Sequence, residues 1–164
     1  MFLSVFPACR LIAAATDIRE FKIPNVVCAA LALGYPMAAF AVGAPVPVIV
    51  EGLVVGVAAL AVGFCLFAGR VFGAGDAKLI AAAAPWIGLQ AMYDFVAGTV
   101  LSGGALAIVL MCFRAAPALP AYARAPWLMR MHQNRLQLPY GVAISVGGLF
   151  AFSGSPLFRL AYSG

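Results

Sequence analysis

Charged residues are scarce in this sequence. Among 164 residues there are ten lysines and arginines, five aspartates and glutamates, and one histidine, so that charged side chains make up only 9% of the chain. Hydrophobic residues make up 65%, and the mean hydropathy is +1.07. A chain of this composition cannot present a water-compatible surface, which excludes a soluble globular protein. The sequence therefore predicts an integral membrane protein.

Residues that bind metals or form disulfides are also few and badly spaced for either role. The single histidine, His132, has no acidic residue or cysteine at ligand spacing, and we expect it to be a solvated loop residue. The four cysteines, Cys9, Cys28, Cys65 and Cys112, lie in or at the ends of apolar runs without a Cys-x-x-Cys spacing. We therefore expect small buried hydrophobic side chains at these positions, no metal and no cofactor.

The chain also lacks the lysine- or arginine-rich start of a secretory signal. The stretch from Met1 to Thr16 carries one charge, Arg10, in the middle of an apolar run. We interpret it as a short first span that is retained. Arg10 lies about 9 Å from the end of this span at Thr16, so its side chain is expected to snorkel to that surface.

The remaining apolar runs predict an all-α bundle of about six transmembrane helices that forms one domain, residues 1–164. A bilayer core needs about 20 apolar residues per helix, so this length holds about six spans with short connections. The expected spans are residues 1–16, 24–42, 48–68, 77–90, 94–113 and 139–152. The third carries Gly52, Gly56 and Gly63, where another backbone can approach closely. The fourth is expected to be broken by Pro85.

Three connections between these spans are polar or rich in turn residues. Residues 17–23 are expected to form a loop, and residues 43–47 a turn. The long segment from Arg114 to Leu138 mixes alanine and proline with Trp127, Met131 and several arginines. It fits either a short basic amphipathic helix lying on the inner leaflet or a plain connecting loop.

The distribution of lysine and arginine predicts the orientation, because positively charged loops stay in the cytoplasm. The connections between spans one and two, three and four, and five and six hold all the loop cations, and the other connections hold none. These cations are Arg19, Lys22, Arg70, Lys78, Arg114, Arg124, Arg130 and Arg135. Both termini are then outside, with Arg159 alone against the rule. The net charge of +5 is explained mostly by topology, and it does not indicate a nucleic acid partner.

This topology brings two aspartates to the same depth at the cytoplasmic face. Asp17 follows the first expected span, and Asp76 precedes the fourth within the polar interruption from Gly73 to Lys78. Acidic residues near the hydrocarbon are costly and therefore suggest function. Glu51 and Asp94 fall on the outer side, where we expect an interfacial residue and a helix-start residue respectively.

Two neighbouring carboxyl groups suit peptide hydrolysis without a metal. One takes a proton from water, and the other, still protonated, donates to the carbonyl or to the leaving amine. A simpler interpretation is also open from the spacing alone. Asp76 is placed to be the N-cap of the fourth helix, and Asp17 to pair with Arg19 or Lys22 in a wet loop.

Three ordered motifs resemble those of the type IV prepilin peptidases, a bacterial family of intramembrane aspartic proteases. The segment from Phe72 to Leu79, FGAGDAKL, is similar to the family's Gly-x-Gly-Asp-x-Lys-Leu motif. Asp17 followed by Ile-Pro-Asn at residues 23–25 resembles the first aspartate segment. The run LPYGVAI at residues 138–144 resembles the opening of the last span.

This resemblance implies a specific activity and site. Asp17 and Asp76 would form the catalytic dyad, and Gly73 and Gly75 would shape the motif. Lys78 would bind nearby polar groups or headgroups, with a snorkelling anchor favoured. Pro139, Tyr140 and Gly141 would help to shape the site or bind substrate. The partner would be a prepilin or pseudopilin precursor. The protein would be a multi-pass protein of the bacterial inner membrane, within the lipid bilayer, and would cut the precursor at the cytoplasmic face.

The chain also departs from the larger members of this family. They carry an additional N-terminal region with paired cysteine motifs, and many methylate the new N-terminus, whereas here the first expected span begins at residue 1. The shorter form resembles the peptidases of Flp/Tad pilus assembly, and methyltransferase activity is not expected. Two other functions stay open: a small proton-coupled transporter or channel subunit that uses the same carboxylates, and a catalytically silent pilus assembly subunit. The sequence gives no oligomeric state.

Overall fold

A computed structural model describes residues 2–117, 125–134 and 137–162. Within these residues every regular element is a helix. The elements are the 3-10 helix η1 (Phe2–Ser4) and the α-helices α1 (Val5–Glu20), α2 (Asn25–Ala41), α3 (Val46–Ala68), α4 (Ala74–Ile87), α5 (Met92–Ala115), α6 (Pro126–Gln133), α7 (Tyr140–Phe152) and α8 (Pro156–Tyr162). The expected all-α class is confirmed for the described part of the chain.

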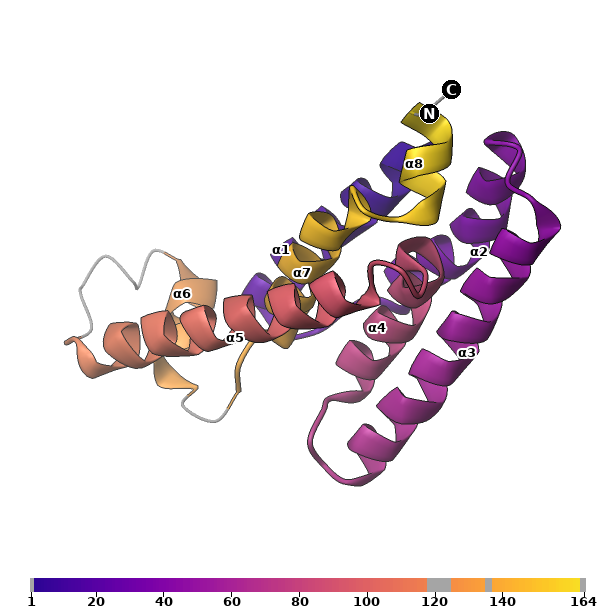
Figure 1. Ribbon diagram of the computed structural model, residues 1–164. Coiled ribbons are helices and arrows are strands. Elements are labelled where there is room, and N and C mark those ends of the chain that lie inside the picture. The colour runs from indigo at the N-terminus through magenta and orange to yellow at the C-terminus, as the bar shows by residue number, and fades with distance from the viewer. Residues whose placement is uncertain (1, 118–124, 135–136, 163–164) are drawn as a thin grey trace.

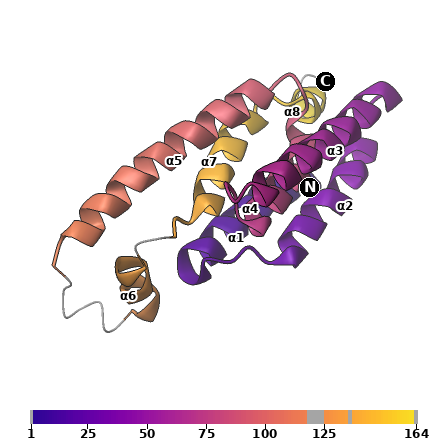
Figure 2. The same cartoon turned by 90° about the horizontal axis from the view of Figure 1, so that it is seen from below.

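Helices α4 and α7 lie at the centre of the packing. Helix α4 packs against α2, α3 and α7, while α7 also packs against α1 and α5. Helix α8 packs against α4, and α5 extends away from the body with α6 near its far end (Figures 1 and 2). The rings of Phe6, Trp86 and Phe152 form the aromatic core, with the Phe6 and Phe152 centroids 4.5 Å apart.

Among the helices that the structure describes, two are long and apolar enough to cross a membrane by themselves. They are α3 with 23 residues and α5 with 24. Helices α7 and α8 are bent by 42° relative to each other, and they add a third crossing if they form one span. Helices α1, α2 and α4 have only 16, 17 and 14 residues, so the described helices do not confirm the expected six crossings.

Helix α1 continues past its expected end. Asp17 was expected in a loop, but it lies on α1, which ends only at Glu20. Phe21 ends the helix by taking a left-handed conformation, with φ 52°, and its N–H donates to the Asp17 carbonyl at 2.9 Å. Few residues other than glycine adopt this conformation, and this is why the sequence did not reveal the boundary.

Helix α4 also differs from its expectation at both ends. It begins at Ala74 instead of residue 77 and ends at Ile87 instead of residue 90. Pro85 does not break it, because the helix continues past the proline and the Gly88 N–H still donates to Ala84 at 3.0 Å. The Pro85 ring is accommodated by the absence of a side chain at Gly56 on α3.

The expectation for Arg10 was wrong. Its side chain does not snorkel to the surface but is completely buried, and Nη2 donates to the Ile144 carbonyl of α7 at 2.9 Å. The guanidinium carbon lies 5.2 Å from the Phe6 ring centroid and 5.5 Å from that of Phe95. A Cβ at Gly148 would collide with the guanidinium, so the small residue makes room for it. Long-range packing therefore decides where this cation lies.

The cysteine expectation was half right, since Cys9 and Cys28 are buried while Cys65 and Cys112 are exposed.

The segment between α5 and α7 contains the short helix α6, so the expected helix, and not a plain loop, is found at residues 126–133. Residues 118–124 and 135–136 of this segment, which include Arg124 and Arg135, lie outside the described residues. His132 is not a solvated loop residue. It lies half-buried on α6, with its ring 5.3 Å from that of Phe113.

The glycine-bearing face of α3 packs closely on α4, as expected. Gly52, Gly56 and Gly63 are buried. A Cβ at Gly56 would lie 2.7 Å from Cγ of Pro85, and one at Gly63 would lie 3.2 Å from Cβ of Ala77. This close contact holds α4, and thereby the Gly73 to Lys78 segment, against α3.

We predict that Gly56→Ala lowers the free energy of unfolding by about 1–3 kcal/mol, because the new methyl group overpacks against the rigid Pro85 ring. Gly104 is a matched control on α5, since a Cβ there meets nothing within 4 Å. Gly104→Ala should leave stability unchanged or raise it by up to about 1 kcal/mol. Unfolding by SDS in mixed micelles measures both. Equal stability of the two variants would contradict the close contact.

Candidate active site

The three sequence motifs meet in one cleft of about 530 Å³. It lies between the end of α1, the start of α4 and the start of α7. The side chains and backbone that line it belong to Asp17, Phe21, Lys22, Ile23, Asn25, Val71, Gly73, Ala74, Gly75, Asp76, Lys78, Gln137, Leu138 and Tyr140. Both aspartates therefore open onto the same polar space.

Asp17 is held by the first turn of α7. Its side chain is 5% exposed, and its Oδ2 accepts a hydrogen bond from the Gly141 N–H at 2.7 Å. The first amides of a helix have no partner within the helix and carry a partial positive charge, which favours a carboxylate there. A Cβ at Gly141 would lie 2.8 Å from the same oxygen. Glycine at this position lets α7 approach the carboxylate, and the interpretation of Asp17 as a residue of a wet loop is wrong.

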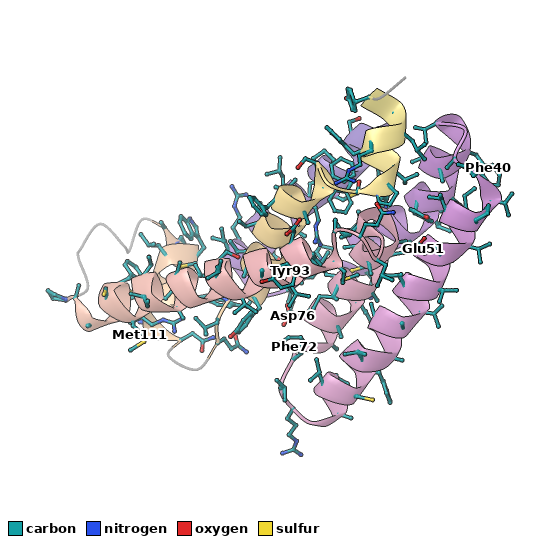
Figure 3. The ribbon with its side chains drawn as sticks, in the orientation of Figure 1. Phe40, Glu51, Phe72, Asp76, Tyr93 and Met111 are labelled. Carbon is teal, nitrogen blue, oxygen red and sulfur yellow. The ribbon has the colours of Figure 1, made fainter. Side chains whose placement is uncertain are left out.

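Asp76 lies in the first turn of α4 and is not its N-cap. The N-cap is Gly73, and Asp76 occupies the third helical position, with Oδ2 accepting from the Gly73 N–H at 3.3 Å. The carboxylate thus accepts a hydrogen bond from the backbone N–H of the N-cap residue, as the acidic residue of a capping box does. Figure 3 shows Asp76 near the start of α4, beside Phe72.

Ile23 links all three motifs. A Cβ at Gly75 would lie 3.4 Å from the Ile23 Cβ, and one at Gly141 would lie 3.0 Å from its Cδ1. The Ile23 side chain therefore fills the space between the two glycines. Two residues further along, Asn25 Oδ1 accepts a hydrogen bond from Lys78 Nζ at 3.2 Å, so that Lys78 binds a polar group of the cleft.

Ile23 and Asn25 belong to a motif in the sequence, but no role was predicted for them. Phe21, Val71 and Gln137 also line the cleft and were not predicted. The Ile-Pro-Asn run was the available signal for Ile23 and Asn25. Pro139 is buried and begins α7 as its N-cap, while Tyr140 is 38% exposed and its ring centroid is 6.3 Å from that of Phe72.

Burial raises the pKa of both carboxyl groups. The pKa of Asp17 rises from 3.8 to about 6, mainly because burial disfavours the charged form. The hydrogen bond from Gly141 lowers the pKa of Asp17, and the nearby charge of Asp76 raises it again. Burial also raises the pKa of Asp76, against the hydrogen bond from Gly73. The two carboxyl groups thus lie close enough for the charge of Asp76 to act on Asp17.

This arrangement can divide the roles of acid and base between two like groups. A pair that keeps one proton offers a carboxylate to activate water and a carboxylic acid to donate a proton. Within the described residues, no three of the His, Cys, Asp and Glu side chains are grouped so that they could hold a metal ion.

The sequence model of the type IV leader peptidase family matches residues 4–108, which include Asp17, Ile23 and the segment from Gly73 to Lys78. No curated protein and no solved structure matches the chain at a significant level.

We predict that the stability of the protein falls as the pH rises through about 6. The folded state holds the Asp17 proton with a pKa of about 6, compared with 3.8 ordinarily, so folding is favoured when this group is protonated. The contribution is complete below pH 3.8 and is lost as the pH rises through the folded-state pKa. Unfolding in micelles at a series of pH values, followed by circular dichroism, measures this dependence.

Asp17→Asn should flatten that dependence, because the asparagine side chain does not titrate. Asp94→Asn, at an exposed aspartate on α5, is the matched control and should retain it. If the curves of all three proteins coincide, Asp17 does not hold the proton as described.

Proposed function

The chain belongs to the type IV leader peptidase family, and we propose that it is an aspartic endopeptidase that removes the basic leader from prepilin-like precursors. The family establishes a protease that resides in a membrane. The choice of prepilins as substrates, the Asp17 and Asp76 dyad, and the pilus assembly role form the proposal. One observation carries it: the buried Asp17 and the half-buried Asp76 both have carboxyl groups with raised pKa values that line one cleft, and the charge of Asp76 raises the pKa of Asp17.

In this mechanism the ionised member of the pair takes a proton from a water molecule, which attacks the carbonyl carbon of the scissile bond. The protonated member donates its proton to the carbonyl oxygen. When the tetrahedral intermediate collapses, this member recovers a proton from a hydroxyl group and the other member gives the proton taken from water to the leaving amine, so no metal or covalent intermediate is required. Gly73 and Gly75 keep the rim beside Asp76 free of side chains, and an extended substrate backbone can pass close to it. Lys78, held by Asn25, and the aromatic ring of Tyr140 line the rest of the cleft.

The cleft end of the molecule is proposed to face the cytoplasm of the bacterial inner membrane, with about six crossings and both termini outside. Arg19, Lys22, Arg70 and Lys78 flank the cleft in sequence and provide the positive charge expected of a cytoplasmic face. Helices shorter than a bilayer core can still cross it when the membrane thins or flanking residues snorkel. All 164 residues are proposed to form one membrane domain.

The decisive experiment is cleavage of purified prepilins in detergent or liposomes. Asp17→Asn and Asp76→Asn should each lower kcat/KM by about 10²–10⁴-fold or more, because each removes one member of the acid and base pair. Asp94→Asn is the control and should cleave at the wild-type rate. Leader removal is followed by mass spectrometry, which also identifies the cleaved bond.

Cleavage that survives both single substitutions would overturn the dyad. If no prepilin is cut and proton flux across liposomes depends on Asp17 and Asp76, the transporter interpretation replaces this proposal.

A further inference from the structure

A second, apolar cavity runs along α4 between α3 and α5. This α3–α5 groove has a volume of about 470 Å³, within the range of about 300–1,000 Å³ that is usual for ligand sites. Its walls include Val55, Ala59 and Val62 of α3, Ile80 of α4, and Val96 and Val100 of α5. None of its described lining residues is charged. Helices α3 and α5 are the two that can each cross a membrane alone, so the groove lies at membrane depth.

The groove extends from the active-site cleft toward the opposite end of the molecule. Its lining starts at Phe72, just before α4, and reaches Leu89 and Met92 beyond the end of α4. The 14 residues of α4 correspond to about 21 Å of helix, or about two thirds of a hydrocarbon core. The groove therefore has the length of several turns of helix.

Phe72 joins the groove to the cleft. Its neighbours Val71 and Gly73 line the cleft, while Phe72 itself lines the groove and its ring contacts that of Tyr140, another cleft residue. Figure 3 shows Phe72 beside Asp76 near the start of α4. A chain that passes Asp76 in the cleft can thus continue into the groove past this aromatic pair.

We propose that the α3–α5 groove binds the hydrophobic helix that follows the scissile bond of the precursor, with Phe72 and Tyr140 marking the junction. This inference rests on the proposed function, because only a leader peptidase has such a substrate at Asp76. The basic leader and the scissile bond need a polar site, while the following segment needs an apolar site at membrane depth. The cleft and the groove provide these in that order.

A helix fits this groove better than a lipid chain does. Small residues of α3 face it, among them Ala58 and Ala59, and such residues allow a second helix to approach closely. A different apolar groove of about 460 Å³ lies between α2 and α3, but Lys78 and Asn25 stand in its lining. An apolar helix that leaves the cleft on that side must pass the Lys78 ammonium, whereas no described residue of the α3–α5 groove is charged.

Photo-crosslinking tests the position directly. Benzoyl-phenylalanine is placed at Val62 in the α3–α5 groove or at Val57 in the α2–α3 groove, both within full-length protein that carries Asp76→Asn. These two valines are matched, because they lie on the same helix and are 60% and 69% exposed. The probe is a synthetic peptide with a lysine-rich leader, a glycine and a Leu/Ala helix of about 20 residues. Labelling is expected from position 62 and not from position 57.

A leader-only peptide is the substrate control and should not be labelled. Labelling mainly from position 57, or no peptide adduct from position 62, overturns the proposal. An adduct at position 62 with phospholipid or with a second copy of the protein, unaffected by the peptide, also overturns it. Because this readout needs no cleavage, it separates failure of the docking site from failure of the proposed protease activity.

Kinetics give the second test once a prepilin that the wild-type protein cleaves is in hand. Val62→Trp should raise the KM for that prepilin by about tenfold, because the indole fills the groove. Val57→Trp should leave KM unchanged, and cleavage of a substrate truncated shortly after the scissile bond should be insensitive to both changes. Equal KM values for the two tryptophan variants would count against the groove.

Discussion

The hydrogen bond between Asp17 Oδ2 and the Gly141 N–H is the interaction on which the site depends. It joins residues 124 positions apart and ties the end of α1 to the start of α7. Without it the carboxylate would lose the amide that offsets part of its burial. The same contact requires glycine at position 141 and brings Ile23 between α4 and α7, so that the three motif segments close around one space.

Much of the site could be predicted from the sequence because charge is so rare in it. With five acidic residues in the chain, only Asp17 and Asp76 fell at the same depth beside apolar runs, and the structure places both on one cleft. The glycines of α3 were similarly informative, since small residues inside an apolar span indicate close helix packing. Patterns of composition and spacing carry this information locally.

Features that depend on distant partners could not be predicted. Nothing near Arg10 in the sequence indicates its hydrogen bond to Ile144 or the space that Gly148 leaves for it. A rule for an isolated helix therefore predicted a surface position for this cation. The end of α1 depends on an unusual backbone conformation at Phe21, and the half-buried position of His132 depends on Phe113 of another helix. Helix α8 and its bend were missed because the expected last span ended at residue 152.

Arg10 has a consequence for biogenesis. Its carbonyl partner, Ile144, is synthesised 134 residues later, and the Phe95 ring that flanks it belongs to α5. A guanidinium is costly inside the hydrocarbon until such partners surround it. As the ribosome delivers the chain, α1 is therefore complete long before these partners exist. Its arginine can settle in its buried position only when α7 has been made, so an early helix is among the last to be locked in place.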